Sequence, residues 1–189
     1  KYLLRISYLH INSHMASIFD TIRKEAGDRD LSINWYKKKV GELSNRITAT
    51  KLMRQGKINA RPDLYDFCMF FYDPKLKKTL PYYDRFPLVF IIELYIDGFL
   101  GLNFHYLPYN LRARLLEELD KRNFRRNYSQ LKRIKLIKPT IKRYLRTNLK
   151  SKFLKLEKDD YAPAIFMPVA RFEKSTESRV FADSRRLAI

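Results

Sequence analysis

The sequence predicts an α+β fold in which helices flank a small antiparallel sheet or a partly closed β-barrel of about five strands. Three observations predict it. Apolar residues recur at steps of three and four on either side of a strand-like block, which is typical of amphipathic helices. The block itself holds apolar and aromatic runs of strand length, two of them joined by an Asp-Gly turn signal. Finally, 189 residues with a hydrophobic fraction of 46% suffice to bury a core.

The first residues are predicted to lie outside the fold. Residues 1–14 read KYLLRISYLHINSH without a starting Met, and Met15 follows them directly. We interpret Met15 as the start of the protein and residues 1–14 as upstream translated sequence or a non-native segment. The alternative is a truncated signal peptide, although the apolar run is short and interrupted for that role.

Residues 15–60 are predicted to form a helical N-terminal arm. A short helix contains Ile18 and Ile22 and ends at Gly27, because glycine commonly follows the last turn of a helix. Ser32 fits the N-cap of a longer helix. The apolar face of that helix is formed by Ile33, Tyr36, Val40, Leu43 and Ile47. Residues 55–63 contain glycine, asparagine and proline without any periodicity, so we interpret them as a linker into the main body.

Residues 61–174 are predicted to form the α+β core, and residues 175–189 an exposed C-terminal tail. The run DFCMFFYDPK predicts a first strand that stops at Asp73-Pro74. The runs PLVFIIELY and FLGLNFHYLP predict a hairpin around Asp97-Gly98, because Asp-Gly readily supplies the positive backbone angles of tight hairpin turns. The runs FLKLE and AIFMPVARF predict two short closing strands.

Residues 110–152 are predicted to be a helical insertion between the third and fourth strands. Pro108 suits the first turn of a helix whose apolar stripe contains four leucines of residues 111–119. A second helical pattern begins at Tyr128, and Pro139 should kink or divide it. The apolar positions of this second pattern are Leu131, Ile134, Ile137, Ile141, Tyr144 and Leu145.

The charge of the chain is concentrated in this same insertion. The protein carries a formal net charge of +19 and a sequence pI near 10. The 43 residues from 110 to 152 hold 15 basic and 3 acidic residues, a balance of +12. Such a surface repels itself unless a polyanion neutralises it, so nucleic acid is the first candidate partner. An anionic membrane is the second, but no run of about 18 apolar residues could span a bilayer.

The basic residues of the insertion are the candidate DNA-binding residues. Lysines recur there every three or four residues while the apolar stripe occupies another sector of the predicted helix, and a basic stripe complements the regular array of phosphates. The alternative is a solvated basic face. Nothing in the stripe indicates base reading, so we predict sequence-independent binding to double-stranded DNA. The predicted contacts are Arg122, Arg125, Arg126, Lys132, Arg133, Lys135, Lys138, Lys142, Arg143, Arg146, Lys150 and Lys152.

Catalysis is not indicated by the acidic, histidine and cysteine residues. A metal-dependent nuclease needs clustered carboxylates, but the acids between Asp63 and Asp97 lack a strand-borne acid followed by Glu-x-Lys. Asp84 adjoins Arg85, which would give it a local partner. His105 and Cys68 are interpreted as structural residues within the apolar block. We therefore predict a protein that is not an enzyme and holds no metal and no cofactor; the single cysteine favours a reducing compartment.

Several sequence blocks resemble a family of phage proteins. These blocks are MFFYDPKLKKTLPYYDRFPLVFII, DGFLGLNFHYLPYNLRARLLEEL, KPTIKRYLRTNLKSKF, PVARF and VFADSRR. They are similar to DNA end protector proteins of T-even-like tailed phages, notably phages of marine bacteria, over roughly residues 35–186. One departure is Thr140, which stands where the family string has Cys, so that Cys is not essential to any shared role.

The resemblance implies a virion protein without catalytic activity. Such a protein would bind the ends of the packaged linear double-stranded DNA near the exit of the head and shield them from host exonucleases. It would be found in the virion, and in the host cytoplasm during assembly and after injection, with other virion proteins near the portal, neck or tail as partners and no membrane partner. Two alternatives remain: a structural neck, tail or baseplate component, and an RNA-binding or host-takeover factor. In each case residues 80–108 are interpreted as scaffold rather than as the DNA-contacting surface.

Overall fold

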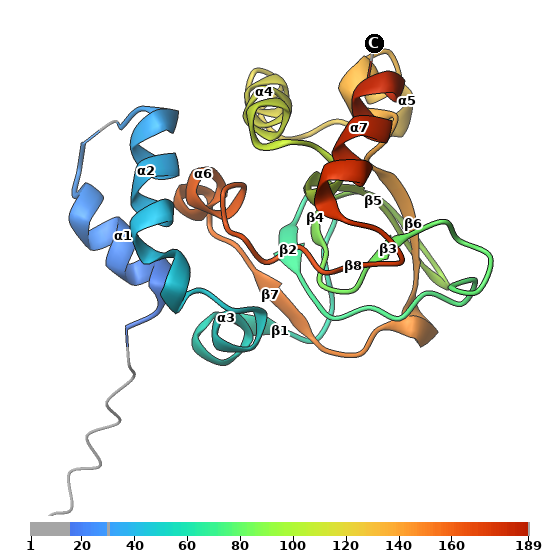
Figure 1. Ribbon diagram of the computed structural model, residues 1–189, viewed down its shortest axis with the longest axis horizontal. Helices are drawn as coiled ribbons and strands as arrows, with labels where there is room; N and C mark the ends of the chain where they lie inside the picture. Colours follow the sequence, from blue (N-terminus) through green and yellow to red (C-terminus); the bar gives the residue numbers. More distant parts are fainter. Residues whose placement is uncertain (1–15, 30, 189) are drawn as a thin grey trace, which may run out of the picture.

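The computed structural model describes residues 16–29 and 31–188, so the prediction for residues 1–14 lies outside the described residues. The described chain is an α+β protein, as predicted, with helices grouped around a curved sheet (Figure 1). The helices are α1 (Ile18–Ala26), α2 (Ile33–Leu43), α3 (Ala49–Gln55), α4 (Tyr109–Asp120), α5 (Tyr128–Leu131), α6 (Tyr161–Ala164) and α7 (Glu177–Leu187).

The main sheet has six antiparallel strands in the order β1-β7-β2-β4-β5-β6, and β3 and β8 form a separate two-stranded sheet. In the described residues the terminal strands β1 and β6 do not pair with each other, so the sheet is not a closed barrel. The strands are β1 (Ile58–Asn59), β2 (Phe67–Met69), β3 (Tyr83–Asp84), β4 (Leu88–Tyr95), β5 (Gly98–Asn103), β6 (Ile141–Leu145), β7 (Phe153–Lys155) and β8 (Phe172–Glu173).

Helix α2 begins at its predicted N-cap and α1 ends at its predicted glycine, whereas α2 ends at Leu43 and leaves Ile47 outside it. The Ser17 side chain accepts a hydrogen bond from the backbone N–H of Asp20 and starts α1, which ends at Gly27 with a φ of 60°. The Ser32 side chain accepts from the backbone N–H of Trp35 and starts α2. The predicted linker differs, because it contains the short strand β1, which pairs with β7.

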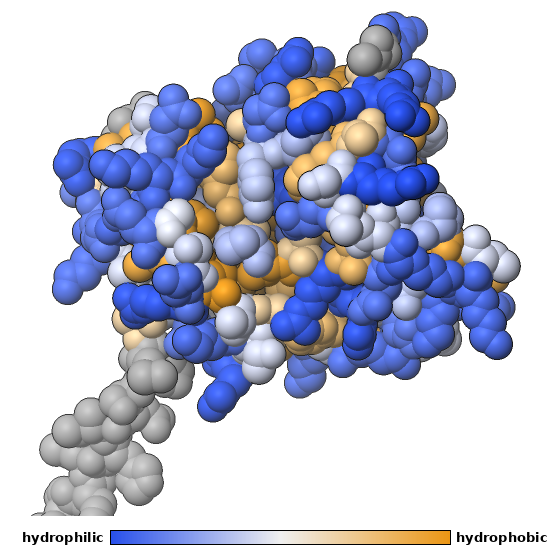
Figure 2. All heavy atoms as spheres, viewed as in Figure 1, coloured by the Kyte–Doolittle hydropathy of each residue, from blue (hydrophilic) through white to orange (hydrophobic). Residues whose placement is uncertain are grey.

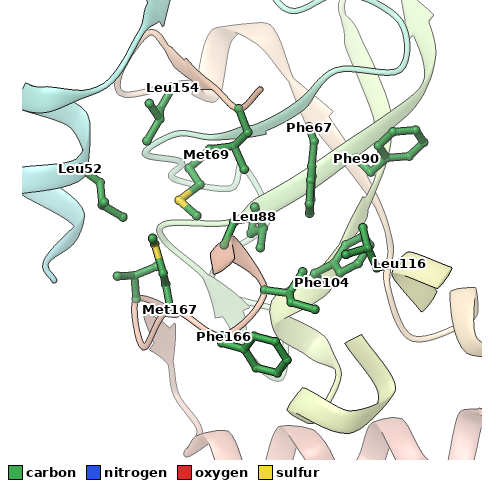
Figure 3. Close-up of a cluster of buried hydrophobic side chains, with 14 of the residues drawn as sticks. Leu52, Phe67, Met69, Leu88, Phe90, Phe104, Leu116, Leu154, Phe166 and Met167 are labelled. Atoms are coloured by element: carbon green, nitrogen blue, oxygen red, sulfur yellow. The ribbon is translucent and has the colours of Figure 1, made fainter. Parts of the chain in front are cut away.

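One buried apolar cluster joins the N-terminal helices to one face of the sheet. Figure 3 shows Leu52 of α3 directed toward the sheet, where Phe67, Met69 and Phe90 pack near Phe104. All of these side chains are buried. Figure 2 shows apolar side chains between the N-terminal helices and the body of the molecule, on a face otherwise dominated by hydrophilic side chains.

The opposite face of the sheet holds a second, aromatic cluster. The rings of Phe70 and Tyr144 lie 5.2 Å apart, and those of Phe99 and Phe153 lie 5.9 Å apart. Two strands separate β5 from β7 in the sheet order, and a flat sheet would hold such strands about 14 Å apart. The sheet therefore curves strongly around these aromatic side chains.

The predicted hairpin of β4 and β5 is confirmed, but its glycine has a different role. Tyr95 pairs with Gly98, so Ile96 and Asp97 form the turn, and neither Asp97 nor Gly98 has a positive φ. A Cβ atom on Gly98 would lie 1.9 Å from the carbonyl oxygen of Tyr144 in β6. The glycine is required because a third strand approaches it closely, not because of the turn.

The helical prediction for residues 128–145 is wrong over most of its length. Only α5 and a 3-10 turn at Lys135–Ile137 are helical, and residues 141–145 form the edge strand β6, which pairs with Gly98–Leu102 of β5. Pro139 interrupts the helical pattern. Ile141 and Tyr144 are favourable strand residues, and the open edge of β5 supplies the backbone partners that override the periodicity. The insertion therefore contains a strand as well as helices.

Two predictions near the C-terminus also need correction. The run AIFMPVARF is not a closing strand, because Ala164 ends α6 and only Phe172 of this run lies in a strand, β8. The part of the predicted exposed tail that the structure describes, residues 175–188, contains a helix, since α7 starts at a Thr176 N-cap and buries Val180 and Ser184. By contrast, the predicted strand FLKLE is confirmed as β7.

Candidate nucleic-acid interface

The twelve predicted DNA-binding residues do not share one helix face. They occupy three successive stretches of chain: the segment after α4, the segment from α5 to the 3-10 turn, and β6 with the loop that leads to β7. In order these stretches contain Arg122, Arg125 and Arg126; Lys132, Arg133, Lys135 and Lys138; and Lys142, Arg143, Arg146, Lys150 and Lys152. Figure 1 shows β6 at the edge of the sheet, with α5 and α7 beside one end of it.

Nine of the twelve residues are exposed cations without a carboxylate partner. Within the described part of the chain, none of the nine takes part in an ion pair, and each has an exposed side chain. They are Arg125, Arg126, Lys132, Arg133, Lys135, Lys138, Arg146, Lys150 and Lys152. Unpaired exposed cations attract a polyanion more strongly than cations already neutralised by neighbouring carboxylates.

The other three residues already have partners. Arg122 donates to the carboxylate of Glu118 at 2.6 Å, which neutralises it locally. Arg143 pairs with Asp97, and its guanidinium lies 3.8 Å from the centre of the Tyr95 ring. Lys142 is half-buried and points along the concave face of the sheet, because alternate residues of a strand share a face and Tyr144 belongs to the aromatic cluster there.

A cavity of about 350 Å³ lies beside Lys142. Its walls come from five stretches of chain: the residues just after β2, the tyrosine-rich segment before and within β3, the end of β5 with the 3-10 turn that follows it, β6 with the residues before it, and the C-terminal half of α7. Lys138, Lys142, Tyr82, Tyr106 and Ser184 line it. The size falls within the range of roughly 300–1,000 Å³ that is usual for small-ligand pockets.

Lys142 forms no ion pair among the described residues, although the buried Asp84 also lines the cavity. Its ammonium group donates to the carbonyl oxygen of Pro139 at 2.9 Å and lies 4.0 Å from the centre of the Tyr106 ring. Burial lowers the pKa of Lys142 to about 8, because the charged form loses solvation. An anion that entered the cavity would meet a partly desolvated ammonium group with donor capacity left over.

A buried pair, Asp84 and His105, supports the wall of the cavity. His105 Nδ1 lies 2.7 Å from Asp84 Oδ2, and the backbone N–H groups of Phe86 and Arg171 each donate to Asp84 Oδ1 at 3.0 Å. Arg85, the expected partner of Asp84, pairs instead with Glu173. The structural interpretation of His105 agrees with these contacts, since they tie the short sheet of β3 and β8 to the main body.

Protonation of this pair follows from its surroundings. Burial lowers the pKa of His105, although the neighbouring Asp84 opposes that shift. Burial alone would raise the pKa of Asp84, but His105 and the two backbone donors outweigh it and hold the pKa of the carboxyl below its usual value. At neutral pH the pair is therefore a carboxylate that accepts a hydrogen bond from a neutral imidazole.

Arg112 is a basic residue of the insertion that serves the fold. Its side chain is fully buried, and it donates to the carbonyl oxygens of Leu107 at 2.7 Å, Ile165 at 3.0 Å and His105 at 3.2 Å. The guanidinium also lies 4.4 Å from the centre of the Tyr109 ring. These contacts join the start of α4 to the segment after α6, so Arg112 is unavailable to a ligand.

The described residues contain no group of three or more His, Cys, Asp or Glu side chains arranged to hold a metal ion. Cys68 is buried within the aromatic cluster, and burial raises the pKa of its thiol.

In the parts of the chain that the structure describes, no helix combines the length and apolarity needed to cross a membrane.

Sequence reasoning missed the cavity because its walls are distant in the chain. Tyr82 and Tyr106 belong to the blocks YYDRF and FHYLP, which we interpreted as scaffold, and Ser184 lies in the expected tail. One signal was available, since tyrosines cluster around two Leu-Pro steps in a basic protein. The pairing of β5 with β6 then brings Lys142 to these tyrosines, and local sequence does not encode that pairing.

Comparison with known proteins identifies one family. The family model described as "Phage T4 terminal DNA protecting protein" matches residues 7–186, which is nearly the whole chain. No curated protein and no solved structure matches the chain.

Proposed function

Because the chain belongs to the family of the phage T4 terminal DNA protecting protein, we propose that it binds the ends of linear double-stranded phage DNA through phosphate contacts and shields them from host exonucleases. The observation that carries the phosphate contacts is the group of nine exposed, unpaired cations in residues 110–152. Shielding follows when the protein occupies the DNA end, because an exonuclease that starts at a terminus needs that terminus to be free.

The proposed contacts are non-specific for sequence. Seven of the nine cations lie in loops and turns, and the other two, Lys135 and Arg146, lie in short 3-10 turns, so none is on an α-helix or a paired strand that could enter a groove as a rigid reader. If about six to ten cations meet phosphates, affinity should fall by roughly a thousandfold to a hundred-thousandfold between 50 and 200 mM salt. An affinity that does not change with salt concentration would contradict the proposed phosphate contacts.

Exonuclease protection tests the shielding directly. Linear duplex and closed circular duplex of equal length are mixed with the protein, and the linear form is then treated with an exonuclease that requires ends. We expect the linear duplex to survive at protein levels too low to coat it, and we expect circular competitor to remove little protein from the ends. Protection that appears only at coating levels, together with equal affinity for circles, would reduce the function to general DNA binding.

A second candidate is a structural component of the neck, tail or baseplate. The turn of the β4 and β5 hairpin favours it, since the Ile96 side chain is 98% exposed and the neighbouring Leu94 is 48% exposed. Apolar side chains at a hairpin tip suit contact with another virion protein. Purified virions distinguish the two functions: end protection requires a copy number set by the DNA ends, whereas a ring component follows the symmetry of its partner.

A further inference from the structure

The cavity beside β6 has features that a general phosphate-binding surface does not need. It is lined by segments that are distant in the sequence, and it holds a half-buried lysine. Phosphates on the outside of a duplex are reached by exposed side chains such as Lys135 and Lys150. A cationic group placed inside a cavity is accessible only to a ligand that enters the cavity.

Ser184 gives an independent indication of a ligand. Its side chain lines the cavity and is 1% exposed, and its hydroxyl oxygen has no hydrogen-bond partner among the described residues. Buried hydroxyl groups in folded proteins are nearly always hydrogen-bonded, because an unpaired one loses its interaction with water. A polar ligand in the cavity would supply the missing partner.

The aromatic walls indicate which kind of ligand fits. Tyr82 lies half-buried in the wall, with its ring 5.9 Å from that of Tyr106 and 6.4 Å from that of Phe172. Tyrosine rings of this kind stack on nucleic-acid bases of any sequence. An ammonium group, an unpartnered hydroxyl and a tyrosine wall together match the phosphate, the polar edges and the flat base of a nucleotide.

We propose that this cavity holds the terminal nucleotide of the DNA, with its phosphate at Lys142 and Lys138, its base against Tyr82, and a polar edge of the nucleotide at Ser184. The inference rests on the DNA-end binding proposed above and deepens it, because it names the part of the molecule that distinguishes an end from the interior of a duplex.

Preference for ends follows from the energetics of stacking. An internal nucleotide must lose two stacking neighbours and its base pair before it can leave the duplex, whereas a terminal nucleotide loses its base pair and only one stacking neighbour. Unpairing is therefore least unfavourable at a terminus. A cavity that accepts only an unstacked nucleotide selects ends without reading the sequence, while the exposed cations bind the adjoining phosphates of either DNA form.

The test compares two lysine variants that remove the same charge. Lys142→Met removes the ammonium group from the cavity, and Lys135→Met removes an exposed one from the same basic segment. Each variant is titrated against a linear duplex and against a closed circular duplex of the same sequence and length, which has no ends and no unpaired loops. Tyr82→Leu is measured alongside, and thermal unfolding verifies that every variant is folded.

We expect Lys142→Met to weaken binding to the linear duplex by about tenfold to a hundredfold, as for the loss of a charge-assisted hydrogen bond, and to leave the closed duplex almost unchanged. Tyr82→Leu should do the same by about fivefold to a hundredfold. Lys135→Met should weaken binding to both duplexes by the same factor, which leaves their ratio as in the wild type.

The outcomes separate this inference from the proposed function. If the wild-type protein binds linear and closed duplexes equally, end binding itself fails. If the wild type prefers linear duplex and both Lys142→Met and Tyr82→Leu retain the full preference, the cavity inference is wrong while end binding stands.

A free nucleotide has the same chemistry as a DNA terminus, so a deoxynucleoside 5′-monophosphate is added as competitor. We expect it to reduce binding of the linear duplex alone, and only at millimolar concentration. If Lys142→Met abolishes binding of the free nucleotide but leaves the preference for linear duplex intact, the cavity is a site for free nucleotides and the inference is overturned.

Discussion

Two adjoining stretches of this chain, residues 80–108 and residues 110–152, differ in nearly every property that their sequences display. The first is apolar and aromatic, with two Leu-Pro steps and few charges, whereas the second holds 15 basic residues. In the structure they meet along the pairing of β5 with β6, and both contribute to the wall of one cavity. The comparison teaches that composition distinguishes the apolar stretch from the basic one. It does not tell which of the two lines the cavity, because both do.

Arg112 gives the largest expected effect, because it is a basic residue of the second stretch whose side chain stabilises the core. Arg112→Met leaves three backbone carbonyl oxygens without their donor in the core. We expect the free energy of unfolding to fall by about 3–5 kcal/mol, as for other broken buried polar networks. Urea denaturation measures it. Arg114→Met, an exposed change on the same helix, should stay within about 0.5 kcal/mol, and equal effects of the two variants would contradict the assignment.

Gly98 tests whether the two stretches depend on close strand pairing. Gly98→Ala forces a Cβ atom against the backbone of Tyr144, so we expect a loss of about 2–4 kcal/mol in the free energy of unfolding. Gly41→Ala is the matched control, because a Cβ atom there meets nothing within 4 Å and helix α2 favours alanine. It should stabilise by about 0.5–1 kcal/mol. A neutral Gly98→Ala variant would indicate that β5 and β6 are less tightly apposed.

Lys142, which we propose binds phosphate, should show the opposite sign, because its removal is expected to raise the free energy of unfolding. Its folded pKa of about 8 lies below the ordinary value of 10.5, so the folded state disfavours the charged form. Each pKa unit corresponds to about 1.4 kcal/mol, and partial exposure reduces the effect, so we expect Lys142→Met to stabilise by about 1–3 kcal/mol at pH 7.

The same shift fixes the pH dependence of this stabilisation. Between pH 8 and 10.5 the unfolded chain retains a proton that folded Lys142 has lost, so the unfolding free energy of the wild type rises with pH relative to that of Lys142→Met. Denaturation curves of both proteins from pH 7 to pH 10 measure the difference. A difference that stays constant over this range would contradict a desolvated Lys142.

His105 gives the smallest expected effect. Burial lowers the pKa of His105 in the folded state. Below about pH 6.5 the unfolded state therefore binds a proton that the folded state does not bind, and the unfolding free energy falls as the pH falls. The loss is limited to about 1.4 kcal/mol for each pH unit. Comparing His105→Gln with the wild type between pH 7 and pH 5 isolates it, since the variant should show a flatter profile. Parallel profiles would indicate that His105 does not titrate differently on folding.

The fold was predictable where neighbouring residues determine the backbone conformation. It was unpredictable where residues distant in the sequence determine it. Ser32 and Gly27 mark a helix start and a helix end by short-range chemistry, and the structure has both. The Asp97-Gly98 step predicted the hairpin at the right place, but Gly98 is required by the approach of β6 and not by the turn. Residues 141–145 keep a helical period but pair with an open strand edge some forty residues away, which no local pattern encodes. The basic segment was visible as charge, whereas the cavity depends on Tyr82, Lys142 and Ser184 coming together from three parts of the chain.

The stoichiometry of binding as a function of DNA length tests the central claim most directly. Complexes with blunt duplexes of about 30, 60 and 90 base pairs are formed at a salt concentration that suppresses weak binding, and their masses are measured by sedimentation. End binding through residues 110–152 and the cavity beside β6 predicts the same number of tightly bound proteins on all three duplexes, set by the two ends. A number of bound proteins that grows in proportion to duplex length would contradict end binding, because it would mean that the basic surface binds the DNA backbone at any position.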